Sequence, residues 1–149
     1  MKVSDYMTRG PMTALATEGA ADTFRTMQML RIRHIPVVDK LGLVAGMVSD
    51  RDLRRPKWLD NGNILGTHFV LDNNLLLGDV MTAPVTAVME HDSLVLAARI
   101  LMLRGFCALP VVNDEGDLVG ILSQVDIVRA YYDANAETDF SLKVQAAVS

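Results

Sequence analysis

Residues 46–53 carry the order Gly-Met-Val-Ser-Asp-Arg-Asp-Leu, and residues 120–127 repeat its frame as Gly-Ile-Leu-Ser-Gln-Val-Asp-Ile. In both stretches a glycine and two apolar residues precede a serine, and an aspartate follows three positions later. The apolar residues predict the end of a strand, and Ser-x-x-Asp predicts the first turn of a helix. Such a turn leaves backbone N–H groups free and carries a partial positive charge, which favours a phosphate. We therefore expect the two turns to bind nucleotides, with the aspartates accepting hydrogen bonds from sugar hydroxyls.

The same spacing also fits a capping box, which closes a helix N-terminus without any ligand. Ser49 with Asp52, and Ser123 with Asp126, are the two pairs concerned. Aspartate is shorter than the glutamate or glutamine that usually completes a capping box, and the motif recurs within a longer repeat. Both observations favour ligand binding, although the two roles are compatible because a capping hydroxyl can still face a ligand.

The motif belongs to an internal duplication with an offset of 74 residues. Residues 21–55 match residues 95–129 without a gap, and residues 3–8 match residues 77–82. Each copy predicts the order strand, helix, strand, strand, helix. One such unit has a sheet too small to stand alone. We therefore expect an α+β fold of two tandem β-α-β-β-α repeats, packed sheet to sheet around a common core with pseudo-twofold symmetry.

The pattern also predicts where the elements lie. The expected strands cover residues 13–15, 35–38 and 43–48 in the first copy, and 86–88, 109–112 and 118–122 in the second. The last helix is expected to end before Pro56 in the first copy and near Tyr132 in the second. The domain limits that follow are residues 1–60 for repeat 1, 61–76 for a turn-rich linker, 77–132 for repeat 2 and 133–149 for a C-terminal tail. That tail is expected either to extend the last helix or to hang free.

Composition excludes several classes of protein. The 149 residues carry a formal charge of −4, whereas general nucleic-acid binders usually have a basic excess. Apolar runs are far shorter than the ~20 residues of a membrane span, and no basic-then-apolar signal peptide is present. Cys107 is the single cysteine, so an intrachain disulfide and a cysteine-rich metal site are excluded. We expect a protein of the reducing cytoplasm.

Catalytic groups do not gather in the sequence. His34, His68 and His91 are scattered and have no acid or nucleophile at a recognisable spacing. Cys107 precedes a predicted buried strand, which favours an inert small hydrophobe over a nucleophile. We therefore expect no enzyme activity.

The complete pattern resembles a known family. Met-Thr, an apolar helix, an apolar residue before Pro-Val-Val with a turn glycine, and then the Ser-x-x-Asp motif, all in tandem, are similar to the paired CBS domain (cystathionine-β-synthase type). The resemblance covers about residues 1–55 and 75–132. It implies a disc-like, stand-alone regulatory module whose two clefts between the repeats hold AMP, ADP, ATP or S-adenosylmethionine. It also implies energy sensing, a homodimer formed through helical faces, and an unidentified target enzyme or transporter.

The resemblance further implies the site residues. By position in the family motif, Asp52 and Asp126 bond the ribose hydroxyls, and Ser49 and Ser123 lie near the ribose or phosphates. Thr13 and Thr86 belong to the early strands that often touch the ligand. The residues before Pro-Val-Val, which supply backbone and apolar contacts to adenine, are Ile32, Arg33, His34, Ile35, Phe106, Cys107, Ala108 and Leu109.

One position departs from the family pattern and makes the two copies unequal. Many nucleotide-binding members have Ser or Thr directly before the aspartate, whereas this chain has Arg51 and Val125 there. Arg51 offers a bidentate phosphate contact and Val125 does not. Further cations cluster near the first motif, at Arg31, Arg33, Arg54, Arg55 and Lys57. This asymmetry predicts one cationic cleft and one poorer cleft, unless the cations only form a solvated helix face. The alternative function is a ligand-free structural module for dimerisation or interaction.

Overall fold

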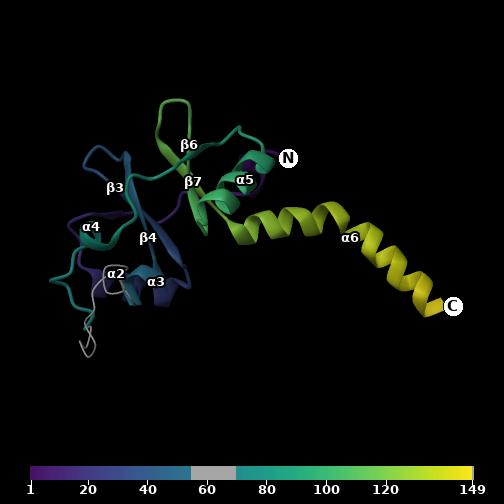
Figure 1. Ribbon diagram of the computed structural model, residues 1–149, viewed down its shortest axis with the longest axis horizontal. Coiled ribbons are helices and arrows are strands. Elements are labelled where there is room, and N and C mark those ends of the chain that lie inside the picture. The colour runs from purple at the N-terminus through teal and green to yellow at the C-terminus, as the bar shows by residue number, and fades with distance from the viewer. Residues whose placement is uncertain (55–69, 149) are drawn as a thin grey trace.

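The computed structural model of the chain describes residues 1–54 and 70–148 (Figure 1). The first copy contains α1 (Val3–Tyr6), β1 (Thr8–Arg9), β2 (Ala14–Leu15), α2 (Ala20–Leu30), β3 (His34–Val38), β4 (Val44–Ser49) and α3 (Asp50–Arg54). The second contains α4 (Leu77–Val80), β5 (Val88–Met89), α5 (Leu94–Arg104), β6 (Ala108–Val112), β7 (Leu118–Ser123) and α6 (Gln124–Val148). Each element of the second copy starts 74 residues after its counterpart, as the starts of α1 and α4 at Val3 and Leu77 illustrate. The predicted duplication and element order are confirmed.

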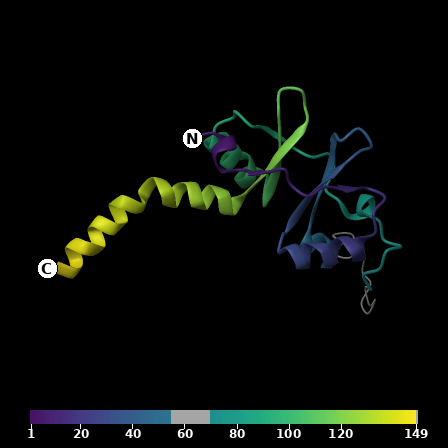
Figure 2. The same cartoon turned by 180° about the vertical axis from the view of Figure 1, so that it is seen from behind.

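Two sheets carry the fold, with strand orders β1-β7-β6-β5 and β2-β3-β4. The hairpins β3–β4 and β6–β7 are antiparallel, while β2 and β5 add to them in parallel. Both views place the hairpins next to one another, with α2 and α3 outside the first and α5 outside the second (Figures 1 and 2). Pro36 and Met47, opposite each other in the β3–β4 register, are also buried although they alternate with the residues that face the helices. The α+β fold of two repeats packed sheet to sheet is confirmed.

The first residues of each copy pack on the other copy. Strand β1 pairs with β7, with Thr8 opposite Ile121, and Thr82 makes the equivalent bridge to Met47 of β4. The Val3 N–H donates to the carbonyl of Asp92 at 2.9 Å. Symmetrically, the N–H of Leu77 donates to the carbonyl of Glu18 at 3.0 Å. The two repeats are therefore interlocked by an exchange of their N-terminal segments.

The glycine that opens each repeated motif makes this exchange possible. A Cβ added to Gly46 would lie 2.6 Å from the sulfur of Met81 and 3.0 Å from the carbonyl oxygen of Thr82. At Gly120 it would lie 2.6 Å from the sulfur of Met7 and 3.0 Å from the carbonyl oxygen of Thr8. Any larger residue would push the crossing segment off the strand. The glycines are thus explained by close backbone approach.

Buried apolar residues form two clusters, and the expected common core is wrong in this respect. One cluster joins Val3 and Met7 to the second repeat around Leu101, Leu109 and Leu122. The other joins Leu77 to the first repeat through Ala14, Ala20, Met27, Ile35, Val37, Val48 and Leu53. Two cores arise because the helices of each repeat cover one face of their own sheet, and this face buries most of the apolar side chains.

The segments outside the sheets differ from the prediction in two places. Helix α6 continues through the expected tail to Val148 and projects away from both sheets (Figures 1 and 2). Strand β5 begins at Val88, so Thr86 precedes it instead of opening it. The predicted linker lies largely outside the described residues, as do Arg55, Lys57 and His68. Within the described residues, none of the helices combines the length and the apolar character that crossing a membrane requires.

Candidate functional site

Both Ser-x-x-Asp motifs form capping boxes. The N–H of Ser49 donates to Oδ2 of Asp52 at 2.9 Å, and the N–H of Asp52 donates to Oγ of Ser49 at 3.1 Å. Ser123 and Asp126 make the same pair of bonds at 2.8 and 3.3 Å. The inference drawn from the shorter aspartate is therefore wrong, because its carboxylate reaches the serine N–H without difficulty. A carboxylate has about four acceptor positions, so capping leaves capacity for sugar hydroxyls.

The first helical turn has fewer free N–H groups than the sequence predicted. The N–H of Asp50 donates to the carbonyl of Arg33 at 2.9 Å, and the N–H of Gln124 donates to the carbonyl of Cys107 at 3.0 Å. With the aspartate N–H groups bonded to serine, two donors of each turn already have protein partners. A bound anion would therefore depend more on side chains than on the helix N-terminus, which corrects the first expectation.

The fold brings the separate pieces of the predicted site together within each repeat. His34 lies opposite Ser49 in the β3–β4 register, and Ala108 lies opposite Ser123 in β6–β7. The two turns are also joined across the strands, since the side-chain amide of Gln124 donates to the carbonyl of Phe106 at 2.9 Å. The residues before Pro-Val-Val thus adjoin the Ser-x-x-Asp turn in both copies.

Exposure divides the candidate residues into three groups. Thr13, Arg33, Arg51 and Cys107 are exposed, so Cys107 is not the buried hydrophobe that was expected. The partly buried residues are Ile32, His34, Ser49, Thr86, Phe106 and Ser123. The buried ones are Ile35, Asp52, Ala108, Leu109 and Asp126.

The buried candidates are restricted in what they can touch. The side chains of Ile35 and Leu109 are 1% and 0% exposed and belong to the two cores. Contact with a ligand at these two positions would come mainly from the backbone. Asp52 and Asp126 are 7% and 6% exposed, so only an edge of each carboxylate is accessible. Oδ1 of Asp126 also lies 3.6 Å from Nη1 of Arg129.

Two hollows of the first repeat divide the candidate residues between them. The first, of about 230 Å³, lies between α2 and α3 and includes Ile32 and Arg33. The second, of about 200 Å³, includes Thr13 and Ile35. Ser49, Arg51 and Asp52 line neither hollow, so the first-repeat candidates do not share one hollow.

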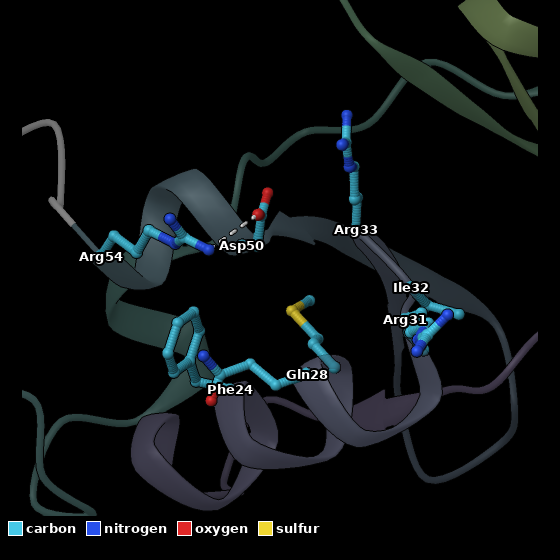
Figure 3. A pocket seen from close by; sticks show the side chains of 8 residues that line it. Phe24, Gln28, Arg31, Ile32, Arg33, Asp50 and Arg54 are labelled. Carbon is cyan, nitrogen blue, oxygen red and sulfur yellow. Dashed lines mark ion pairs between the residues drawn. The ribbon is translucent and has the colours of Figure 1, made fainter.

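The first hollow contains residues that sequence reasoning did not nominate. Phe24, Gln28 and Asp50 line it together with Arg31 and Arg54. Nη2 of Arg54 lies 3.8 Å from Oδ2 of Asp50, and its guanidinium lies 5.5 Å from the centre of the Phe24 ring. Figure 3 shows Arg54, Phe24 and Asp50 on one side and Arg31 with Ile32 on the other. The run of arginines was the signal for this hollow, although Arg51 itself does not line it.

His34 is the titratable group between the two halves of the first site. Burial lowers the pKa of its imidazole from the ordinary 6.5, and the nearby charges of Asp50 and Asp52 partly oppose this shift. In the second repeat the equivalent residue is Ala108, so only the first site contains this group. Over residues 1–54 and 70–148, no three His, Cys, Asp or Glu side chains gather closely enough to hold a metal ion.

Solved structures with the same architecture are available for comparison. A putative acetoin utilization protein, AcuB from Vibrio cholerae, is 31% identical with a TM-score of 0.76, over 93% of this chain and 97% of that one. CBSX2 of Arabidopsis thaliana in complex with AMP is 26% identical with a TM-score of 0.72, over 90% of this chain and 98% of that one. Both likenesses extend across the two repeats.

Sequence relatives include proteins that are much longer. Homoserine O-acetyltransferase of Methanocorpusculum labreanum is 29% identical over 83% of this chain but only 23% of its own length. The chain covers 44% and 46% of the next two curated relatives, which are uncharacterized proteins of Methanocaldococcus jannaschii. The matched region is thus a quarter to a half of these proteins. A family model described as the CBS domain matches residues 3–56 and 77–133. Since these two matches take in most of its length, the chain belongs to the CBS domain family and contains a tandem pair of such domains.

Proposed function

We propose that the chain is a regulatory module that binds an adenosine-bearing ligand in clefts between its repeats and modulates a partner. The observation that carries this proposal is the adjacency, in both copies, of the residues before Pro-Val-Val and the Ser-x-x-Asp turn. The structure of CBSX2 with AMP supports the choice of ligand class. AMP, ADP, ATP and S-adenosylmethionine are the ligands to test.

Each group has a chemical role in this proposal. Asp52 and Asp126 accept hydrogen bonds from the ribose hydroxyls through the carboxylate positions that capping leaves free. The backbone of residues 32–35 and 106–109 contacts the adenine ring. Arg51 is exposed beside the first aspartate and can hold a phosphate, whereas Val125 cannot. We therefore propose that the Arg51 side favours the more highly charged nucleotides.

A binding role without catalysis, exerted on another protein, fits the relatives. Domains of this family are parts of longer proteins, including homoserine O-acetyltransferase, in which the matched region is 23% of the length. We propose that this pair likewise reports ligand binding to an enzyme or transporter. The cytoplasmic location that the single cysteine suggested remains a prediction.

Calorimetry with AMP and ATP on wild type, Asp52→Ala and Asp126→Ala tests the proposal. Losing a charged hydrogen-bond partner costs about 1.5–3 kcal/mol, so affinity at the altered site is expected to fall roughly 10- to 100-fold. Because each aspartate also caps a helix, a control must lose a cap without losing the site. Asp79→Ala provides it, since Oδ2 of Asp79 accepts from the Leu76 N–H at 3.1 Å in the same arrangement.

The control separates ligand binding from helix capping. Asp79→Ala is expected to keep wild-type affinity. Equal affinities in wild type and both site variants would leave the two aspartates with the capping role alone. Undetectable binding of all four ligands to the wild type would refute the sensor proposal.

A ligand-free dimerisation module is the second candidate, because α5 and the start of α6 expose apolar side chains. Val95, Met102, Leu103 and Val128 are 65–79% exposed. Such a patch is typical of protein contact surfaces, and we propose a homodimer formed through it. Thermal melting distinguishes the two functions, since a ligand at 100 times its Kd adds about 2.7 kcal/mol to the stability. A melting temperature that responds to none of the four ligands, in a protein that still dimerises, would favour the structural role.

A further inference from the structure

The hollow between α2 and α3 concentrates positive charge in an acidic chain. Arg31, Arg33 and Arg54 line it, and Asp50 is the one carboxylate among the residues that do so. Across residues 1–54 and 70–148, no carboxylate lies within the 4.0 Å of an ion pair from the guanidinium of Arg31 or Arg33. The hollow therefore carries a net positive charge although the whole chain has a formal charge of −4.

The equivalent positions of the second repeat contain no charge. With the offset of 74 residues, the four charged residues of the hollow correspond to Gly105, Cys107, Gln124 and Val128. The two repeats share the same backbone elements, so the fold alone does not require charges at these positions. The cations distinguish the first repeat and call for an explanation other than folding.

Arg31 is also held in an unfavourable backbone conformation. It follows the last residue of α2 with φ of 55° and is a non-glycine residue in the left-handed region. The N–H of Ile32 donates to the carbonyl of Met27 at 3.0 Å, which is the helix end that calls for this conformation. The second repeat places Gly105 there with φ of 67°. Left-handed geometry costs a non-glycine residue about 1–2 kcal/mol, so an arginine at this point suggests a functional use of its side chain.

The geometry of the hollow suits a small anion. Arg31 and Arg54 approach from opposite sides, while Met27 and Ile32 add an apolar surface between them (Figure 3). Arg54 is paired only at 3.8 Å with the partly exposed Asp50, a contact that an anion can replace. A guanidinium binds phosphate through two parallel hydrogen bonds. We propose that this hollow binds a small phosphate-bearing anion, with its phosphate between Arg31 and Arg54, at a site separate from the adenosine-binding turns.

Calorimetric titration with pyrophosphate on wild type, Arg31→Gly and Arg54→Gln tests this inference. Both variants lie outside the adenosine residue set, and each is expected to weaken pyrophosphate binding roughly 10-fold. Arg31→Gly introduces the residue that the second repeat uses, so it is expected to melt no lower than wild type. The loss of binding would then not result from a loss of folding.

Arg104→Ala is the matched control, because it removes an exposed cation from the end of α5 in the second repeat. Its affinity for pyrophosphate is expected to equal that of the wild type. Three results would overturn the proposal: no binding by wild type, unchanged binding by Arg31→Gly, or an equal loss in Arg104→Ala. The last result would indicate attraction by overall charge and not by this hollow.

Discussion

The two repeats share one backbone plan but present different helical faces to their surroundings. In the second repeat Leu96, Met102, Val125 and Val128 are apolar and 42–74% exposed. Their counterparts in the first repeat are Asp22, Gln28, Arg51 and Arg54. The buried positions differ much less, since Met27 and Leu101, or Ile35 and Leu109, occupy the same places in the two cores.

This contrast indicates which positions specify the fold and which are free to acquire a function. Core side chains and crossing-segment glycines are matched because both copies need the same packing. The outer helical faces are not under that constraint. One has become apolar, as a protein contact requires, and the other has become cationic, as an anion site requires.

The largest expected effect tests the interlocking of the repeats. Leu77 is 0% exposed and belongs to the core of the first repeat, although its sequence position is in the second. Leu77→Ala is expected to lower the free energy of unfolding by about 2–5 kcal/mol, since a buried leucine leaves a cavity. Urea denaturation gives the magnitude, and hydrogen exchange should show faster opening of β3 and β4 than of β6 and β7. The reverse order of opening would contradict the exchange of segments.

A smaller effect tests the difference between the helical faces. Met102→Glu places a charge in the apolar face of α5 and is expected to weaken the proposed homodimer at least 10-fold. Gln28→Glu makes the equivalent change on α2 and serves as its matched control. Sedimentation equilibrium would measure both dimer constants. Equal weakening by the two changes would mean that dimerisation does not distinguish the repeats.

The smallest effect concerns His34, whose counterpart Ala108 cannot titrate. Burial lowers the pKa of His34 in the folded protein, so the unfolded chain binds its proton at higher pH. This contribution to stability is fully present above the ordinary value of 6.5 and is lost as the pH falls from there through the folded pKa. His34→Gln is expected to flatten the pH dependence of the urea midpoint below 6.5. An identical slope in the variant would show that His34 does not cause it.

Most of the fold could be predicted because the duplication repeats long-period signals. The strands around Pro36 and Pro110 and the helices before them follow from apolar periodicity and turn residues. The exchange of α1 and α4 could not be predicted, since a four-residue helix carries no information about which sheet it will meet. The common core failed for a related reason: a strand that is apolar on both faces does not indicate which face meets helices.

The candidate site was predictable in composition and less so in geometry. The adjacency of His34 and Ser49 follows once β3 and β4 pair, and sequence patterns indicated that hairpin. The capping bonds of Asp52 depend on distances of a few tenths of an ångström, which no pattern of residue types specifies. The participation of Phe24 and Asp50 in the first hollow required the packing of α2 against α3, and only coordinates provide it.

The exchanged segments have a consequence for synthesis on the ribosome. The first repeat obtains Leu77 and Met81 for its core from chain that is translated after its own last strand. The N-terminal strand waits longer still, because its partners Gly120 and Ile121 emerge near the end. A nascent chain that contains only the first repeat therefore keeps apolar surface open, and chaperones that recognise such surface have their longest opportunity to bind before α4 is delivered.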